Sequence, residues 1–173
     1  TNVEIEYVTY LGGGAPFFKV LAGLEQGTYY YVRVSAHNSQ GYGEPATSTP
    51  GSLQPYEAPS APTNVMLAVT SNSMLTVSFF APFSDGGDDV VSYRVEWDTQ
   101  PGFNSNDPKP HKDFIDLDAA TYNSYTIRYL ETRQYYVRVF AINAAGPGAP
   151  AVANPAALTA ALVTPGRPHT IAA

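Results

Sequence analysis

The sequence contains no cysteine and few charged residues. Asp, Glu, Lys and Arg together make up 14% of its 173 residues, whereas an average soluble domain has roughly 25%. Without cysteine the chain can form no disulfide framework, no thiolate metal site and no cysteine nucleophile. The surface polarity must therefore come mainly from uncharged polar side chains and from the backbone.

Clusters of basic residues and long apolar runs are also missing. The net charge is −6 and the pI is near 4.8, whereas nucleic acids and anionic membranes are recognised first by grouped Lys and Arg. No apolar run approaches the roughly 18 residues of a membrane span. We therefore expect no nucleic-acid partner and no membrane insertion by this segment.

No known catalytic motif stands in the sequence. The three histidines, His37, His111 and His169, lie far apart and outside any recognised triad context. The sequence has no GxSxG or HExxH, and the glycine run 12–14 lacks the Lys of a phosphate loop. We predict a non-enzymatic chain without a cofactor.

A repeat is the strongest feature that is present. Residues 30–46 (YYVRVSAHNSQGYGEPA) and 135–151 (YYVRVFAINAAGPGAPA) are identical at 11 of 17 positions, at an offset of 105. Alternating apolar residues predict a strand with one buried face in each copy, and the Asn and Gly residues that follow predict a hairpin turn. The side chains expected to point inward are Tyr30, Val32, Val34 and Ala36, and Tyr135, Val137, Val139 and Ala141.

Further strand-like segments precede the second copy, separated by Pro, Gly, Asp and Asn clusters. They are predicted at 63–69, 74–80, 90–98, 114–117, 124–127 and 135–143, with a last strand near 156–164. The alanine-rich last segment could instead form two helical turns, because Ala and Leu are strong helix formers. This spacing of short strands is typical of a β-sandwich.

Several motifs together resemble the fibronectin type III family. They are APSAPTNV (58–65), LTVSF (75–79), PFSDGG (82–87), YRVEW (93–97), Leu130 before Tyr135, and the repeated YxVRVxAxNxxGxG block. The resemblance implies an all-β fold of tandem immunoglobulin-like antiparallel β-sandwiches. It also implies a structural tyrosine corner at Tyr30 and Tyr135, in which the hydroxyl bonds to upstream backbone.

The resemblance divides the chain into three parts. Residues 1–55 would be the C-terminal part of one domain, with strands at 3–10 and 17–21; residues 56–166 would be a complete domain, and 167–173 a linker or tail. A half sandwich leaves its apolar face uncovered, so we expect a stretch of a longer protein. The proline-rich segment 49–63 predicts an extended, stiff connection.

The outward side chains of two strands form a candidate protein-binding face. Alternation buries Tyr93, Val95 and Trp97 and turns Arg94, Glu96 and Asp98 outward. The candidate binding residues are Arg94, Glu96, Tyr136, Arg138, Phe140 and Ile142. Aromatic and Arg side chains dominate protein interfaces, although a neighbouring domain could simply cover this face.

Two acidic groups are alternative site candidates. The loop 85–89 holds Asp85, Asp88 and Asp89, and carboxylates of this kind can bind calcium. The spacing does not fit an EF-hand, and a solvated turn is the simpler interpretation. A second group, Asp116 and Asp118 with Asp113 nearby, is expected to serve solubility.

These observations predict a spacer and protein-interaction module of a larger, extracellular or surface-attached protein. The expected partners are neighbouring domains or further copies in an assembly, and cell adhesion is one such setting. The alternatives are an accessory module of a secreted enzyme, a segment of an intracellular filament or cytoskeletal array, and a receptor ectodomain. The location rests on family resemblance alone.

Overall fold

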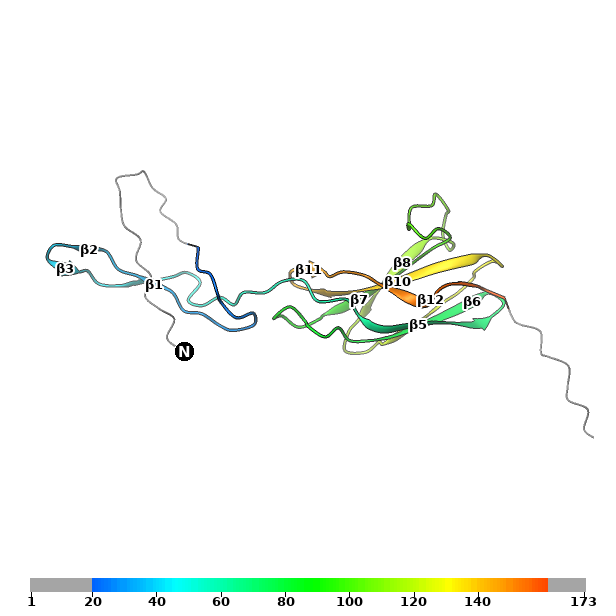
Figure 1. The fold of residues 1–173 in the computed structure, drawn as a ribbon, viewed down its shortest axis with the longest axis horizontal. Coiled ribbons are helices and arrows are strands. Elements are labelled where there is room, and N and C mark those ends of the chain that lie inside the picture. Colours follow the sequence, from blue (N-terminus) through cyan, green and yellow to red (C-terminus); the bar gives the residue numbers. More distant parts are fainter. Residues whose placement is uncertain (1–19, 162–173) are drawn as a thin grey trace, which may run out of the picture.

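A computed structural model describes residues 20–161 of the chain. Every regular element in that range is a strand. Figure 1 shows an elongated molecule in which a small N-terminal group of strands is joined by a narrow connection to a larger body of strands. We call residues 20–55 the first unit and residues 57–161 the second unit.

The second unit is a sandwich of two antiparallel layers. One layer contains β8, β7, β10 and β12 in that order, and the other contains β5, β6 and β9; β12 runs parallel to β5 where the layers meet. The strands are β5 (Thr63–Ser71), β6 (Met74–Phe80), β7 (Ser92–Asp98), β8 (Asp113–Asp118), β9 (Ser124–Ile127), β10 (Gln134–Asn143), β11 (Gly146–Pro147) and β12 (Ala151–Thr159). The predicted all-β, immunoglobulin-like fold is confirmed.

The alternating residues of these strands fill the space between the layers. Val137, Val139 and Ala141 of β10 are fully buried. Phe79 and Tyr93 pack across the layers with ring centroids 4.8 Å apart. Burial of this kind contributes about 1.5–3 kcal/mol for each large apolar side chain.

Trp97 adds a polar contact to this core. Its ring is buried, and Nε1 donates a hydrogen bond of 2.7 Å to the carbonyl oxygen of Pro110. The indole N–H is therefore satisfied, as a buried donor must be. Phe79 on β6 carries no such donor and belongs to the same core cluster.

The last strand was predicted too late in the chain. The strand β12 begins at Ala151, not near residue 156, and the described part of the alanine-rich segment contains no helix. Ala151 and Val152 pair with Val139 and Arg138, and after a bulge the pairing resumes with residues 157–159. Pairing with an otherwise open strand edge thus outweighs the helix propensity of alanine.

The first unit repeats the hairpin of the second. Its strands are β1 (Arg33–Val34), β2 (His37–Asn38), β3 (Gly41–Tyr42) and β4 (Ala46–Thr47). The pairs of β1 with β4 and of β2 with β3 recur 105 residues later as the pairs of β10 with β12 and with β11. The duplication seen in the sequence is therefore also a duplication of hydrogen-bond register.

The predicted burial in the first unit is wrong. Val34 is 69% exposed, Val32 is 37% exposed, and Ala36 is also exposed. The described part of this unit has no second layer of strands that could cover the apolar face, so the alternation survives without the burial.

Some predictions lie outside residues 20–161. These are the strand at 3–10, the turn at 12–14, most of the strand at 17–21, the end of the last strand beyond 161, and the tail 167–173. Leu21, at the end of the predicted strand 17–21, belongs to no strand.

Candidate interaction face

Four of the six predicted binding residues meet on the outer side of β7 and β10. Directly opposed residues of antiparallel strands place their side chains on the same face. The registers of β8, β7 and β10 create two rows across the sheet: Phe114, Glu96 and Arg138 in one, and Asp116, Arg94 and Phe140 in the other. We call the six predicted residues, Arg94, Glu96, Tyr136, Arg138, Phe140 and Ile142, the interaction face.

Arg138 is held at the centre of this face. Its Nε donates a 2.6 Å hydrogen bond to Glu96 Oε2 on the neighbouring strand. The guanidinium carbon lies 4.0 Å from the ring centre of Phe103 and 5.2 Å from that of Phe140. A carboxylate and two aromatic rings therefore fix the position of this cation.

Arg94 is held in the same way by β8. Its Nε and Nη2 donate bonds of 2.7 and 2.8 Å to the two carboxylate oxygens of Asp116, and its guanidinium lies 4.3 Å from the ring centre of Phe114. The hydrogen bonds from Arg94 lower the pKa of Asp116, and the hydrogen bond to Asp116 raises the pKa of Arg94. Both groups stay charged, and the pair is bidentate.

Tyr136 and Ile142 lie at the two ends of the face. Tyr136 lies opposite Asp98, and its hydroxyl donates a 3.3 Å bond to Gln134 Oε1. Ile142 lies opposite Ser92, next to the turn that leads to β11. Both side chains are half-buried, and their register positions place them beside the two rows, outside either one.

Asp98 lies opposite Tyr136 on the outer side of the sheet, as alternation predicts, but it is not exposed there. Its side chain is fully buried beneath the loop 99–112. Burial alone would raise its pKa, but hydrogen bonds from Ser105 and the Gln100 backbone, together with Lys112 at 3.4 Å, bring the pKa below its usual value. The loop folds back over the strand end, so the side chain anchors the loop.

Several residues of this surface escaped the sequence analysis. Phe103, in the loop after β7, covers Arg138, and no alternation pattern extends into a loop. Phe114 and Val152 are exposed apolar residues that extend the face on β8 and β12. Asp116 was predicted to serve solubility, yet it holds Arg94. Its outward direction was foreseeable, but the pairing register of β7 with β8 was not.

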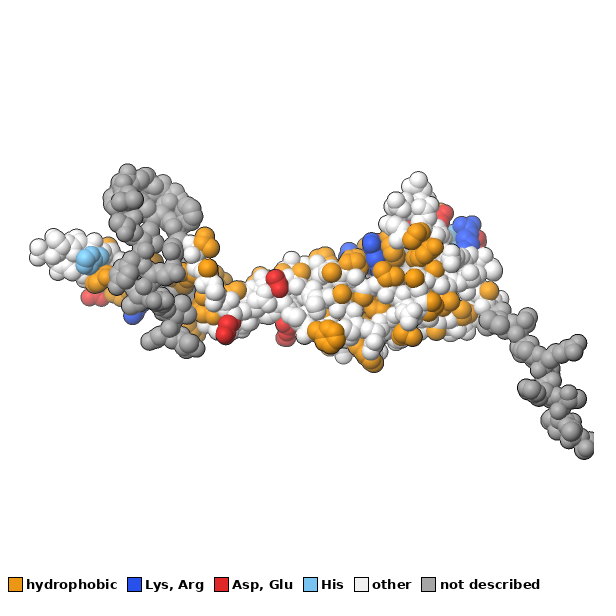
Figure 2. Space-filling view, viewed as in Figure 1, with side chains coloured by type: hydrophobic (Ala, Val, Ile, Leu, Met, Phe, Trp, Pro, Cys, Tyr) orange, Lys and Arg blue, Asp and Glu red, His pale blue; other side chains and the backbone are white. Residues whose placement is uncertain are grey.

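Figure 2 shows how sparse the charge is on one side of the molecule, where basic groups border hydrophobic side chains over the second unit. Because each arginine of the interaction face is paired with a carboxylate, the face carries little net charge. This arrangement is unlike the unpaired basic surface that phosphate recognition requires.

The acidic loop 85–89 is a turn in which Asp85 and Asp89 are exposed, as the sequence favoured, and Asp88 is half-buried. Gly86 is buried, and the carboxylates of Asp85 and Asp88 accept hydrogen bonds from the backbone N–H groups of Gly87 (2.8 Å) and Ala144 (3.0 Å). Within residues 20–161 no group of three potential ligands could hold a metal ion. The acidic side chains shape the loop instead.

Both tyrosine hydroxyls contact upstream backbone. Tyr30 accepts a 2.9 Å hydrogen bond from the N–H of Glu25, and Tyr135 accepts a 3.3 Å bond from the N–H of Glu131. The second contact spans one residue fewer, which matches the five positions from Leu130 to Tyr135 against six from Leu24 to Tyr30. The Tyr135 hydroxyl also lies 2.9 Å from His111 Nδ1. Burial raises the pKa of Tyr135.

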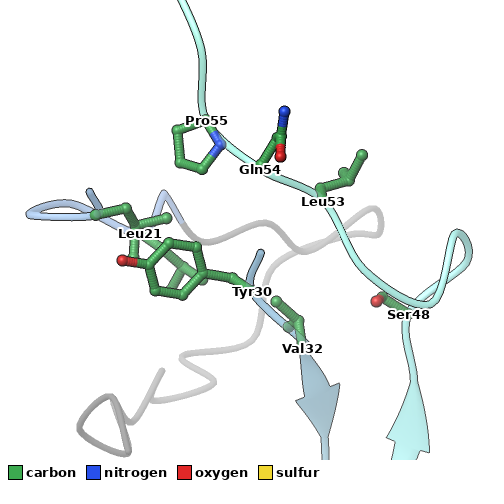
Figure 3. A pocket seen from close by; sticks show the side chains of 8 residues that line it. Leu21, Tyr30, Val32, Ser48, Leu53, Gln54 and Pro55 are labelled. Carbon is green, nitrogen blue, oxygen red and sulfur yellow. The ribbon is translucent and has the colours of Figure 1, made fainter. Parts of the chain in front are cut away.

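An apolar groove opens on the first unit (Figure 3). Tyr30 and Val32 of the repeated block line it together with Leu21, and Leu53 and Pro55 border it from the connecting segment. In the second unit the residues equivalent to Tyr30 and Val32 are Tyr135 and Val137, which are fully buried. Within residues 20–161 no second layer of strands covers this groove, so it corresponds to core surface of the second unit.

The described residues contain no helix long and apolar enough to cross a membrane.

Comparison with known proteins identifies the class. The family model for the fibronectin type III domain matches residues 60–154, which is more than half of the chain. The chain therefore belongs to the fibronectin type III family. Domains of this family are typically non-catalytic modules with structural and protein-interaction roles in multi-domain proteins.

Two curated relatives are similar to this chain. The human ankyrin repeat and fibronectin type-III domain-containing protein 1 is 40% identical over 100 residues, which cover 57% of this chain and 8% of that protein. The mouse ankyrin-repeat and fibronectin type III domain-containing 1 is 39% identical over 92 residues, covering 53% and 7%. The chain thus matches less than a tenth of each relative.

A solved structure supports the fold. Domains A168–A170 of titin superpose with a TM-score of 0.54 at 22% identity, covering 81% of this chain and 44% of that one. At this identity the likeness concerns the fold alone.

Proposed function

We propose that the chain is a non-enzymatic spacer and protein-interaction module of a larger multi-domain protein, and that it binds protein partners through the interaction face. The observation that carries this proposal is the pair of arginines: Arg94 is held by a carboxylate and one aromatic ring, and Arg138 by a carboxylate and two rings. Arg and aromatic residues are the side chains most enriched at interface hot spots.

The fixed arginines reduce the cost of binding. Ordering a long side chain at an interface costs about 0.5–1.5 kcal/mol, and in this face the ordering is already present in the free molecule. Phe114 and Val152 keep more than a third of their surface exposed. They supply apolar area that a partner can bury.

The partner follows from the charge balance. Glu96 and Asp116 neutralise the two arginines, so a strongly charged partner gains little from this surface. We propose a partner with an apolar and aromatic centre, either a neighbouring domain or a second copy of the chain.

The replacement Phe140→Ser tests the face. It removes the ring beside Arg138 and should weaken self-association of the full chain about tenfold, or about 1.4 kcal/mol, in sedimentation velocity. Phe80→Ser is the matched control, because Phe80 is an exposed aromatic residue on β6, a strand of the other layer. Fluorescence of Trp97 reports whether each variant keeps its fold.

Equal association of both variants would contradict the proposed face. If the wild-type chain stays monomeric, a second copy is not the partner, and the two variants are then compared for binding to the adjacent domains of the parent protein.

We also propose that residues 1–55 are the C-terminal part of another copy, that 56–166 form a complete domain, and that 167–173 are a linker or tail. The repeated strand register and the groove in the first unit support this division. Expression of 56–166 alone should preserve one cooperative unfolding transition at the same denaturant concentration as the full chain. A large loss of stability would contradict the boundary at 56.

We also propose that the protein lies outside the cell or on its surface. This part of the proposal is supported by the family resemblance alone. External protease applied to intact cells should cleave the protein. Protection until the cells are lysed would favour the intracellular array instead.

A further inference from the structure

The two units are joined at Tyr56, and the residues on both sides of it are held by backbone hydrogen bonds. The carbonyl oxygen of Pro55 accepts a 2.9 Å hydrogen bond from the N–H of Gly27 in the first unit. The N–H of Glu57 donates a 2.9 Å bond to the carbonyl oxygen of Gly86 in the second unit. Only Tyr56 lies between these two anchors, so no flexible linker separates the units.

The second unit also holds its own first residues, 57–60, at further points. The amide nitrogen of Asn143, which is buried, donates 2.7 Å hydrogen bonds to the carbonyl oxygens of both Glu57 and Asp85. Farther along, the N–H of Ser60 donates a 2.9 Å bond to the carbonyl oxygen of Ser84. The Asn143 side chain therefore ties Glu57, at the start of the second unit, to the loop before β7.

The same loop contacts the first unit directly. A Cβ atom at Gly87 would lie 2.5 Å from the nitrogen of Gly27 and 2.9 Å from the Cβ of Gln26. The side-chain amide of Gln54 donates a 3.3 Å bond to the carbonyl oxygen of Gly87. The backbones approach as closely as only glycine allows, and Gly87 also has a positive φ of 87°.

We propose that the loop 84–88 of the second unit is a docking site, that its occupant is the turn 25–28 of the first unit, and that this contact fixes the orientation of one unit relative to the next. The acidic side chains of the loop serve this contact by bonding to the backbone and giving the loop its shape. The proposal rests on the spacer role proposed above. It adds that the spacer holds the two units in a fixed relative orientation as well as at a fixed distance.

The absence of native cysteine makes a direct test simple. Ser39→Cys and Ala120→Cys introduce one exposed thiol into each unit, and spin labels on both report the distribution of distances between the units. A chain with eight Gly and Ser residues inserted between Tyr56 and Glu57 gives the freely hinged reference, because such a linker spans about 16 Å on average.

The first variant pair changes the second unit. Gly87→Ala should broaden the distance distribution about twofold or more, towards that of the lengthened chain. Gly146→Ala is the control, because Gly146 also has a positive φ but a Cβ there would meet nothing within 4 Å. Its distribution should match that of the wild type.

The second variant pair changes the first unit and cannot unfold the sandwich. Gly27 and Gly23 both have φ of 72°, but only Gly27 lies against Gly87. Gly27→Leu should therefore broaden the distribution while Gly23→Leu leaves it unchanged, and Trp97 fluorescence should stay constant in both.

Two results would overturn the proposal. One is a wild-type distribution as broad as that of the lengthened chain, and the other is a narrow distribution in both Gly87→Ala and Gly27→Leu. Neither result bears on binding through the interaction face, which Phe140→Ser tests separately, so failure of the docking site and failure of the binding role can be told apart.

Discussion

Val34 and Val139 occupy the same position in two copies of one hairpin, yet only Val139 is buried. Val139 is 0% exposed and pairs with Ala151, whereas Val34 is 69% exposed and pairs with Ala46. The strand pairing is the same, and the local sequences are closely similar. The difference lies across the sheet, where Val139 faces a second layer of strands and the described part of the first unit provides none.

The comparison separates two properties that are often inferred together. Alternation along a strand decides which side chains share a face. Burial also requires a second surface, and it is burial that stabilises the fold. Substitutions at equivalent positions of the two hairpins should therefore have unequal effects, and each pair below tests that inequality.

The largest difference is expected for Val139→Asp and Val34→Asp. The first places an unpaired carboxylate in the core, which costs several kcal/mol out of a typical total of about 5–15 kcal/mol. Cooperative unfolding of the second unit should be lost in denaturant titrations followed by Trp97 fluorescence. Val34→Asp should change the stability by no more than about 0.5 kcal/mol.

An unchanged unfolding curve for Val139→Asp would refute the assigned inner face of β10. In a longer chain that supplies a covering layer to the first unit, Val34→Asp should become as damaging as Val139→Asp.

An intermediate difference is expected for Asn143→Asp and Asn38→Asp. Both asparagines accept a 2.9 Å bond from the N–H two residues later, and aspartate keeps that bond. Only Asn143 also donates to the carbonyl oxygens of Glu57 and Asp85. A carboxylate there should cost about 2–4 kcal/mol at neutral pH, whereas the change at Asn38 should be close to neutral.

The pH dependence provides a second measurement for this pair. Carbonyl oxygens around the introduced carboxyl group at position 143 should raise its pKa in the folded state, so its destabilisation should lessen as the pH falls through that pKa. Equal unfolding midpoints for the two variants at pH 7 would contradict the role given to the Asn143 amide.

The smallest difference is expected for Tyr135→Phe and Tyr30→Phe. The buried Tyr135 hydroxyl contacts the N–H of Glu131 and His111 Nδ1, and its loss should cost about 1–2 kcal/mol. Water can replace the Tyr30 hydroxyl at its exposed contact with Glu25, so only a few tenths of a kcal/mol should be lost there. Equal decreases in Tm for the two variants would contradict this prediction, because the buried Tyr135 hydroxyl would then contribute no more stability than the exposed Tyr30 hydroxyl.

The sequence alone was sufficient to predict strand bounds and inward-facing residues where these depend only on the pattern of a single strand. The bounds 74–80 and 124–127 agree with β6 and β9, and the inward direction of Tyr93, Val95 and Trp97 is confirmed. Alternation, turn residues and family motifs supplied all of this information locally.

The remaining features depend on contacts between distant segments. The start of β12 follows from pairing with β10, and the burial of Asp98 follows from a loop that folds back over it. The bidentate contact of Arg94 requires the register of β7 with β8. The contact between Gly27 and Gly87 joins residues of different units, and no periodicity in either segment encodes such a contact.

The parallel placement of β5 and β12 has a mechanical consequence. These are the first and last strands of the second unit, and they run in the same direction, with Asn154 opposite Met66. When both ends of the unit are pulled apart, the two strands are drawn past each other lengthwise. The contact between them is then loaded in shear, along the direction of the strands.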